Sequence, residues 1–220
     1  MSDASALPHG PLPRGPLPHG PLPHGPLNER TVHLCIDMQR LFAEETPWHT
    51  PWMERVLPVV VRIAEEHPEQ TIFTRFIPPR HPDEMRGTWR RFYRRWAELT
   101  LERIDPGVLE LFPPLARLVP PAVTIDKHVY SPFSETAIWQ VLRERHADTL
   151  VFTGAETDMC VLAAVLDAVD YGFRVVLATD AICSSSDRTH DALMTLYHHR
   201  FSEQIETVTS EAIIDAWPRH

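Results

Sequence analysis

Cys160 stands where a thiol can do chemistry. A predicted strand at 149–153 passes through Gly154 into a predicted helix that begins near residue 158. A thiol in the first turn of a helix faces unpaired N–H groups and the positive end of the helix dipole, which can lower its pKa from about 8.5 to roughly 3.5–7.5. Such a thiol is partly ionised at neutral pH and can act as a nucleophile. The alternative is a small apolar residue that packs the helix against a sheet.

Two further strand ends carry ionisable side chains. The apolar run 31–36 ends in Asp37, and a short β-branched run ends just before Lys127. The carboxyl ends of parallel strands meet at one edge of an α/β sheet, where such folds place their sites. Taken singly, Asp37 could cap a helix and Lys127 could be a solvated surface charge. Together with Cys160 they predict a catalytic group of acid, cation and thiol.

The motifs around these residues resemble those of the isochorismatase-like cysteine hydrolases, a family that includes nicotinamidases and N-carbamoylsarcosine amidase. Asp37 follows the first strand, Lys127 begins K-x-x-Y-S-x-F, and Cys160 lies in G-x-x-T-D-x-C-V. The resemblance covers residues 32–216 approximately. It implies that Cys160 is the nucleophile, Asp37 its base, and Lys127 the cation that holds the ion pair together.

The resemblance also implies a backbone arrangement beside the thiol. The family's non-proline cis peptide falls on Ala155 and Glu156 of this chain. Its oxyanion hole corresponds to the backbone N–H groups of Glu156 and Cys160. Losing one such donor typically costs about 100- to 1000-fold in rate.

The predicted reaction is hydrolysis of a C–N bond in a small amide, carbamoyl or ureide substrate, through a thioester and without a cofactor. Nicotinamidases carry a D-x-H metal motif, whereas this chain reads TRFIPPRHPDEM over 74–85, so His81 is alone and no metal is expected. Isochorismatases that cleave a vinyl ether lack the cysteine, so Cys160 argues against that reaction. The alternative function is a non-catalytic binding or scaffold protein on the same fold, which would not need the acid, the cation and the thiol together.

The segment GTWRRFYRRW, residues 87–96, is rich in arginine and aromatic rings. The resemblance places this region near the active site, so some of its side chains, with two outside it, are candidate contacts for a substrate carboxylate or ring. These candidates are Arg75, Trp89, Tyr93, Trp96 and Phe133. The alternative is a subunit contact or a helix with solvated arginines, and the sequence does not decide whether residues 77–105 cover the site or join subunits.

Alternating strand and helix patterns surround these residues. Strands are predicted at 31–36, 70–76, 122–126, 149–153, 174–178 and 204–208, and helices at 51–66, 134–145, 158–171, 188–197 and near the C-terminus. This alternation predicts an α/β fold with a doubly wound, mainly parallel six-stranded sheet and helices on both faces. The resemblance implies the strand order 3-2-1-4-5-6. Ser134 and Ser186 are predicted as helix N-caps.

Residues 1–28 differ from the rest because they repeat the unit PLPHG, with Arg14 replacing histidine in one copy. Proline removes backbone donors and the sparse leucines form no periodic face, so we predict a disordered, partly polyproline II tail. The hydrolase domain is then 29–220. The alternatives for the tail are a loose metal-binding tract of His9, His19 and His24, or a docking ligand.

Composition limits the partners. The 220 residues carry a formal net charge of -9, which argues against nucleic acid as a partner. The three cysteines form no CxxC pair, which is typical of a reducing compartment, and we expect a cytoplasmic protein. No apolar run reaches the roughly 18 residues of a membrane span, so no membrane is expected. The resemblance implies a small-molecule substrate and a homo-oligomer of unspecified subunit number.

Overall fold

The computed structural model describes residues 22–218, which form a single six-stranded sheet in which every strand pair is parallel. The strand order is β3-β2-β1-β4-β5-β6, as predicted. The strands are β1 (Thr31–Ile36), β2 (Thr71–Phe76), β3 (Val123–Lys127), β4 (Thr149–Ala155), β5 (Arg174–Cys183) and β6 (Ile205–Val208). The predicted fold class and strand order are confirmed.

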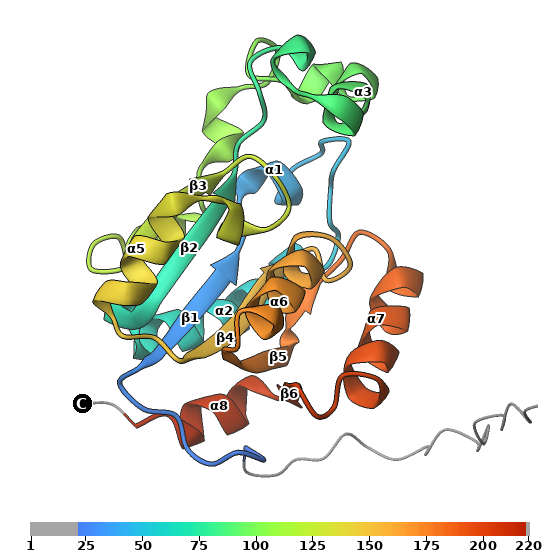
Figure 1. Ribbon diagram of the computed structural model, residues 1–220. Coiled ribbons are helices and arrows are strands. Elements are labelled where there is room, and N and C mark those ends of the chain that lie inside the picture. The colour runs from blue at the N-terminus through green and yellow to red at the C-terminus, as the bar shows by residue number, and fades with distance from the viewer. Residues whose placement is uncertain (1–21, 219–220) are drawn as a thin grey trace, which may run out of the picture.

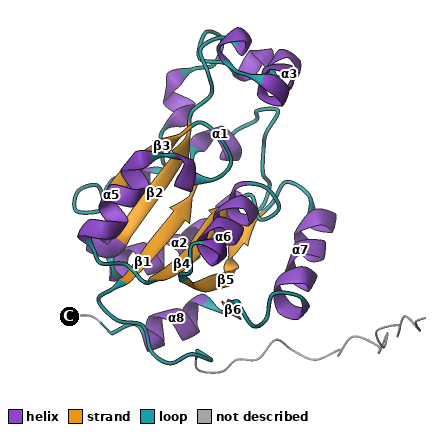
Figure 2. Ribbon diagram, in the orientation of Figure 1, coloured by secondary structure: helices purple, strands orange, loops and turns teal. Residues whose placement is uncertain are grey.

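Helices cover both faces of the sheet (Figures 1 and 2). They are α1 (Arg40–Ala43), α2 (Met53–Glu66), α3 (Gly87–Arg95), α4 (Pro113–Ala116), α5 (Thr136–Glu144), α6 (Cys160–Asp170), α7 (Asp187–His199) and α8 (Ser210–Ala216). Buried residues of α5, α6 and α7 belong to one apolar cluster, and those of α1, α2, α4 and α8 belong to the other. Within residues 22–218, no helix has the length and apolar character that a membrane crossing requires.

The central strands β1 and β4 are buried along their whole length because helices lie on both sides of them. All six residues of β1 are buried. Val32, Leu34 and Ile36 join the cluster that contains α5 and α6, whereas Cys35 joins the cluster of α2. This period of two on a strand buried on both faces is the pattern of a parallel sheet. It makes Cys35 a core residue, away from the chemistry.

Gly154 lets β1 and β4 run together just before the site residues. It has a φ of +103°, and a Cβ at this position would lie 2.0 Å from the carbonyl oxygen of its partner Ile36. Only glycine fits such a close backbone approach. The two strands therefore deliver the residues that follow them, Asp37 and the Cys160 segment, to adjacent positions.

Residues 22–28, here called the N-terminal strap, pack on the domain although they were predicted to lie in the tail. Leu22 and Leu27 are buried in the α2 cluster. Arg174 donates to the carbonyl oxygens of Gly25, at 2.7 Å, and of Pro26, at 3.2 Å. The two buried leucines are enough to hold the strap on the domain because the Arg174 side chain also fixes the backbone between them. The structured region therefore begins before residue 29, while residues 1–21, with most of the repeat, lie outside the described residues.

The two predicted helix caps have different outcomes. Ser186 accepts a hydrogen bond from the N–H of Thr189 and caps α7, which confirms its prediction. The prediction for Ser134 is wrong, because α5 is preceded by Glu135 with no side-chain cap. Ser134 belongs to a 3-10 turn and donates to the carbonyl oxygen of Ser131.

Candidate active site

The structure brings Asp37, Lys127 and Cys160 together at the carboxyl edge of the sheet. Lys127 Nζ lies 2.7 Å from Asp37 Oδ2 and 3.3 Å from Cys160 Sγ, and it donates to the carbonyl oxygen of Val129 at 3.1 Å. Asp37 and Lys127 are fully buried, and Cys160 is 7% exposed. The ammonium thus donates hydrogen bonds to the sulfur and to a backbone carbonyl oxygen, and it forms an ion pair with the carboxylate.

Lys127 is held in its charged form. Burial lowers the pKa of its ammonium, but the interactions with Asp37 and Cys160 together outweigh this effect and raise the pKa above its ordinary value. The ring of Phe76 adds a cation–π contact at 4.7 Å from Nζ. A buried cation that remains ionised can stabilise negative charge on the acid and on the sulfur.

Asp37 is fixed by Thr74, a β2 residue that sequence reasoning missed. The Thr74 hydroxyl donates to Asp37 Oδ1 at 2.6 Å and accepts from the Asp37 backbone N–H at 3.1 Å. Asp37 has a φ of +49°, a left-handed conformation that aspartate tolerates better than most residues. Among the described residues, no donor is aligned for a hydrogen bond with Oδ2, although the ammonium of Lys127 lies close to it. This oxygen keeps a lone pair available for a proton.

The Gln39 side chain links backbone groups at the carboxyl edge of the sheet, a role that the sequence analysis did not predict. Its amide nitrogen donates to the carbonyl oxygens of Leu109, at 2.8 Å, and Phe76, at 3.2 Å, and its oxygen accepts from the N–H of Phe76 at 2.7 Å. The side chain is fully buried. Its position two residues after Asp37 was the signal available in the sequence, since a buried carboxamide can satisfy several backbone groups where loops meet.

Cys160 is the first residue of α6, but the predicted lowering of its pKa is not found. Burial is the largest influence and raises the pKa of the thiol. The ammonium of Lys127 opposes this effect, while the charge of Asp37 and a hydrogen bond to its carboxylate add to it. The prediction considered the helix terminus and omitted the desolvation of a buried sulfur. In the free protein the thiol is therefore protonated at neutral pH.

The turn between β4 and α6 places backbone groups beside the sulfur. The Ala155–Glu156 peptide bond is cis. The Glu156 side chain accepts from the N–H of Ser185 at 2.8 Å, and its carbonyl oxygen accepts from the N–H of Val161 at 3.1 Å. The N–H of Cys160 belongs to the first turn of α6, where no carbonyl oxygen of the helix lies four residues earlier.

A cavity of about 240 Å³ opens above the thiol. It is lined by Phe42, Trp48, Phe76, Phe92, Trp96, Tyr130, Glu156, Asp158, Met159, Cys160 and Ser185. Trp48 is central to the aromatic wall, with ring centroids of Phe92 and Phe76 at 5.7 and 5.9 Å. Phe42, in α1, and Trp48, in the segment between α1 and α2, were missed because neither belongs to a motif. α3 and the residue after it supply Phe92 and Trp96, so the segment 77–105 contributes to the wall of the cavity.

The predicted aromatic contacts lie at different depths. Trp96 lines the cavity. Tyr93 is fully buried behind the wall, with its ring centroid 6.4 Å from that of Trp48. Trp89 supports the wall from outside, 4.7 Å from Tyr130 between ring centroids. Of the three aromatic contacts predicted in this segment, one lines the cavity and two support its wall, while Phe92, which was not predicted, lines the cavity as well.

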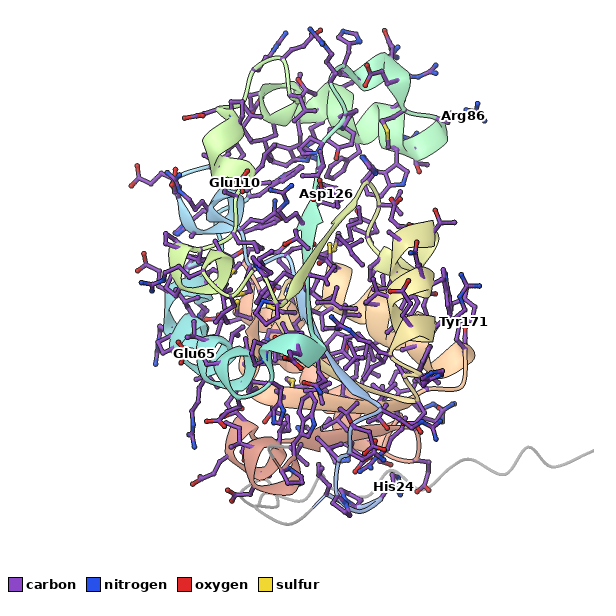
Figure 3. The ribbon with its side chains drawn as sticks, turned by 90° about the vertical axis from the view of Figure 1, so that its left-hand side faces the viewer. His24, Glu65, Arg86, Glu110, Asp126 and Tyr171 are labelled. Carbon is purple, nitrogen blue, oxygen red and sulfur yellow. The ribbon has the colours of Figure 1, made fainter. Side chains whose placement is uncertain are left out.

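Arg75 and Phe133 are not at the cavity, so these two predicted contacts are corrected. Arg75 forms a bidentate pair with Asp126, at 2.7 and 3.0 Å, and a further bond to Glu110 at 2.9 Å. The labelled acids in Figure 3 mark this group. Because two carboxylates satisfy the guanidinium, it has no role in holding a substrate anion. Phe133 is buried on the α5–α6 face, with Tyr171 5.6 Å away between centroids.

A second cavity, of about 330 Å³, contains no residue of the catalytic group. It is lined by Trp52, Ile182, Cys183, Ser184, Asp187, His190 and Asp191. Burial, with a smaller effect of Glu156, raises the pKa of Cys183 to about 12, so this thiol is a poor nucleophile. No set of three His, Cys, Asp or Glu side chains within residues 22–218 is arranged to hold a metal ion.

Comparisons of the sequence and of the structure with known proteins give matches to related hydrolases. Residues 31–209 match the family model described as Isochorismatase domain. An uncharacterised isochorismatase family protein of Bacillus subtilis is 32% identical over 81 residues, 37% of this chain and 44% of that protein. The maleamate amidohydrolase of Pseudomonas putida is 25% identical over 118 residues, 54% of this chain and 53% of that enzyme. The matched stretches thus span about half the length of these curated relatives.

Among solved structures, a cysteine hydrolase from Pseudomonas syringae pv. phaseolicola superposes with a TM-score of 0.74. It is 26% identical in sequence, and the match covers 90% of this chain and 97% of that one. The similarity therefore extends over the sheet and over the edge that carries the candidate site.

Proposed function

Because the chain belongs to the isochorismatase family, we propose that it is a cysteine amidohydrolase that cleaves a C–N bond of a small amide, carbamoyl or ureide substrate. One observation carries this proposal. The buried ammonium of Lys127 contacts both the Asp37 carboxylate and the Cys160 sulfur at the floor of a cavity. The name of the Pseudomonas putida relative, an amidohydrolase, supports the reaction class.

The first half-reaction makes a thioester. Asp37 Oδ2 takes the thiol proton as Cys160 Sγ attacks the carbonyl carbon, and the C–S bond forms. The resulting oxyanion accepts hydrogen bonds from the backbone N–H groups of Glu156 and Cys160. Asp37 then gives the proton to the nitrogen, the C–N bond breaks, and the amine or ammonia leaves.

The second half-reaction returns the free thiol. Water attacks the thioester carbonyl while Asp37 takes one of its protons, and the C–S bond breaks as that proton passes to the sulfur. The products are the acid and the regenerated Cys160 thiol. Lys127 remains charged in both steps and stabilises the carboxylate and the departing thiolate.

The raised pKa of the thiol supports a mechanism in which the proton leaves the thiol as the sulfur attacks, and not before. A thiol that is protonated in the free protein needs a base at the moment of attack, and the Asp37 carboxylate, which interacts with this thiol, can accept its proton. Lys127 alone would favour a resting thiolate. Burial and the adjacent carboxylate outweigh it, so proton transfer accompanies substrate binding and attack.

The test is release of ammonia from a panel of small amides, N-carbamoyl amino acids and ureides, with a chelator present. We expect release by the wild type and by Cys35→Ala, which removes another buried thiol, and none by Cys160→Ala. Mass spectrometry of the quenched wild type should show acylation of Cys160. Release that survives in Cys160→Ala would contradict the mechanism, and release by no variant from any compound would favour the binding-protein alternative.

A further inference from the structure

The wall of the catalytic cavity is acidic and aromatic. Six of its lining side chains are aromatic rings, two are the acids Glu156 and Asp158, and none is lysine, arginine or histidine. The nearest buried cation, Lys127, is already paired with Asp37 at 2.7 Å. The charge that a bound substrate meets is therefore negative.

The hydrogen bonds that these two acids accept within residues 22–218 come from uncharged groups. The Ser184 hydroxyl donates to Asp158 at 2.6 Å, and the Ser185 N–H donates to Glu156 at 2.8 Å. The Thr50 hydroxyl lies 3.4 Å from the same Glu156 oxygen. Such partners orient a carboxylate without cancelling its charge, so an anionic substrate would meet like charge in a partly desolvated cavity.

The aromatic wall favours the opposite sign. A cation over an aromatic face is attracted by the negative face of the ring, and quaternary ammonium groups are recognised in this way by clustered rings. Trp48, Trp96 and Tyr130 supply rings to the cavity. One exposed guanidinium, that of Arg95, already lies 5.2 Å from the Trp96 ring centroid, so the outer side of the wall also attracts a cation.

We infer that the substrate carries a positive charge in its acyl part, as a quaternary or protonated ammonium group, and not a carboxylate. This inference rests on the proposed function. The amide carbonyl carbon lies at Cys160, and the ammonium group lies among the rings, beside Asp158. The site then discriminates by charge, while the catalytic group performs the same hydrolysis on any amide that reaches the sulfur.

Two nearly isosteric amides test the charge directly. Trimethylammonioacetamide and 3,3-dimethylbutanamide differ by a nitrogen cation in place of a carbon, and succinamate supplies the anion. We expect kcat/KM for ammonia release to be at least tenfold higher for the cation than for the neutral amide, and lowest for succinamate. An equal or higher value for the neutral amide would overturn the inference and leave the hydrolase mechanism standing.

Two variants test whether Asp158 and Trp96 cause the preference for the cationic amide. Asp158→Asn keeps an oxygen for Ser184 but removes the charge, so the ratio of cation to neutral kcat/KM should fall at least threefold. Trp96→Leu keeps apolar volume but removes a ring, and the ratio should fall as well. Glu65→Gln removes a charge on the exposed face of α2, labelled in Figure 3, and should leave the ratio unchanged. A fall of the same size in Glu65→Gln would contradict a local effect.

Binding without turnover separates the two proposals. Choline and 3,3-dimethylbutan-1-ol, which differ by the same exchange, are compared for protection of Cys160 against iodoacetamide at pH 9. Stronger protection by choline supports the charged site even if none of the three amides is hydrolysed, in which case the hydrolase proposal alone is weakened. Equal protection by the two compounds would overturn the inference.

Discussion

Asp37 has two opposed effects on Cys160. As the proposed base it promotes attack, but its carboxylate also raises the pKa of the resting thiol. Asp37→Asn should therefore lower kcat/KM by about 100-fold or more, the usual range for a general base. The same change should increase the rate of Cys160 alkylation by iodoacetamide at pH 8, because Lys127 then acts on the thiol unopposed.

The pH dependence in the wild type provides the control. Because the pKa of the Cys160 thiol is raised, its thiolate fraction grows about tenfold per pH unit across the neutral range. Alkylation of Cys160, followed by peptide mass spectrometry, should rise from pH 7 to pH 9 without a plateau. A plateau near neutral pH, or slower alkylation in Asp37→Asn, would show that the thiolate already exists in the free protein.

Lys127 matters to stability as well as to chemistry. Lys127→Met leaves the fully buried Asp37 carboxylate without its cation, and breaking such a pair typically costs about 3–5 kcal/mol of unfolding free energy. The double variant Lys127→Met, Asp37→Asn should recover most of this loss and remain inactive. Urea unfolding measures the free energies, and additive effects in the two single variants and the double variant would contradict direct coupling.

The close contact of β1 with β4 at Gly154 should be essential for the stability of the sheet. Gly154→Ala places a Cβ 2.0 Å from the Ile36 carbonyl oxygen, so the strands must separate, and we expect a loss of more than about 3 kcal/mol or failure to fold. Gly172→Ala is the matched control. Its φ is also positive, at +82°, but nothing lies within 4 Å, so it should cost only about 1–2 kcal/mol.

The position of the chemistry was predictable where a strand end coincides with an ionisable residue. Asp37 directly follows β1, Lys127 ends β3, and Cys160 begins the helix after β4, and the parallel topology brings these strand ends together. Thr74 and Gln39 were not predictable in this way because their roles depend on which neighbour each side chain reaches across the sheet edge. The same limit applies to Arg75, whose acidic partners lie 35 and 51 residues away along the chain.

The wall of the cavity was less predictable than its floor. Trp96 follows from the aromatic segment, but Trp48 lies in an irregular connection with no periodic pattern. The thiol's pKa was misjudged for a related reason. A helix terminus can be recognised in a sequence, whereas the degree of burial of Cys160 depends on rings contributed by distant segments.

At the scale of the whole molecule, His33 should make stability depend on pH. It is fully buried between the hydroxyls of Thr71 and Thr153, and burial lowers its pKa from 6.5 to about 3, with a smaller effect of His67. Below pH 6.5 the unfolded chain binds a proton that the folded one excludes, so the unfolding free energy falls as pH drops toward 3. The slope from this group approaches about 1.4 kcal/mol per pH unit.

Urea unfolding between pH 7 and pH 4 measures this slope in the wild type and in His33→Gln. The variant should be less stable at pH 7 but should show a shallower decline below pH 6.5. His81→Gln removes an exposed histidine and should leave the slope as it is. A slope that is the same in His33→Gln as in the wild type would assign the acid sensitivity to other groups.

The strands that deliver the catalytic group also determine when activity can return after denaturation. Asp37 follows β1, Thr74 lies in β2, Lys127 ends β3, and Cys160 follows β4, and these are the four neighbouring strands at one side of the sheet. A refolding chain must pair all four in register before the sulfur, the ammonium and the carboxylate meet. The return of catalytic activity therefore reports when the last of these strand pairings forms. It should occur later than the spectroscopic signal of any single helix or strand.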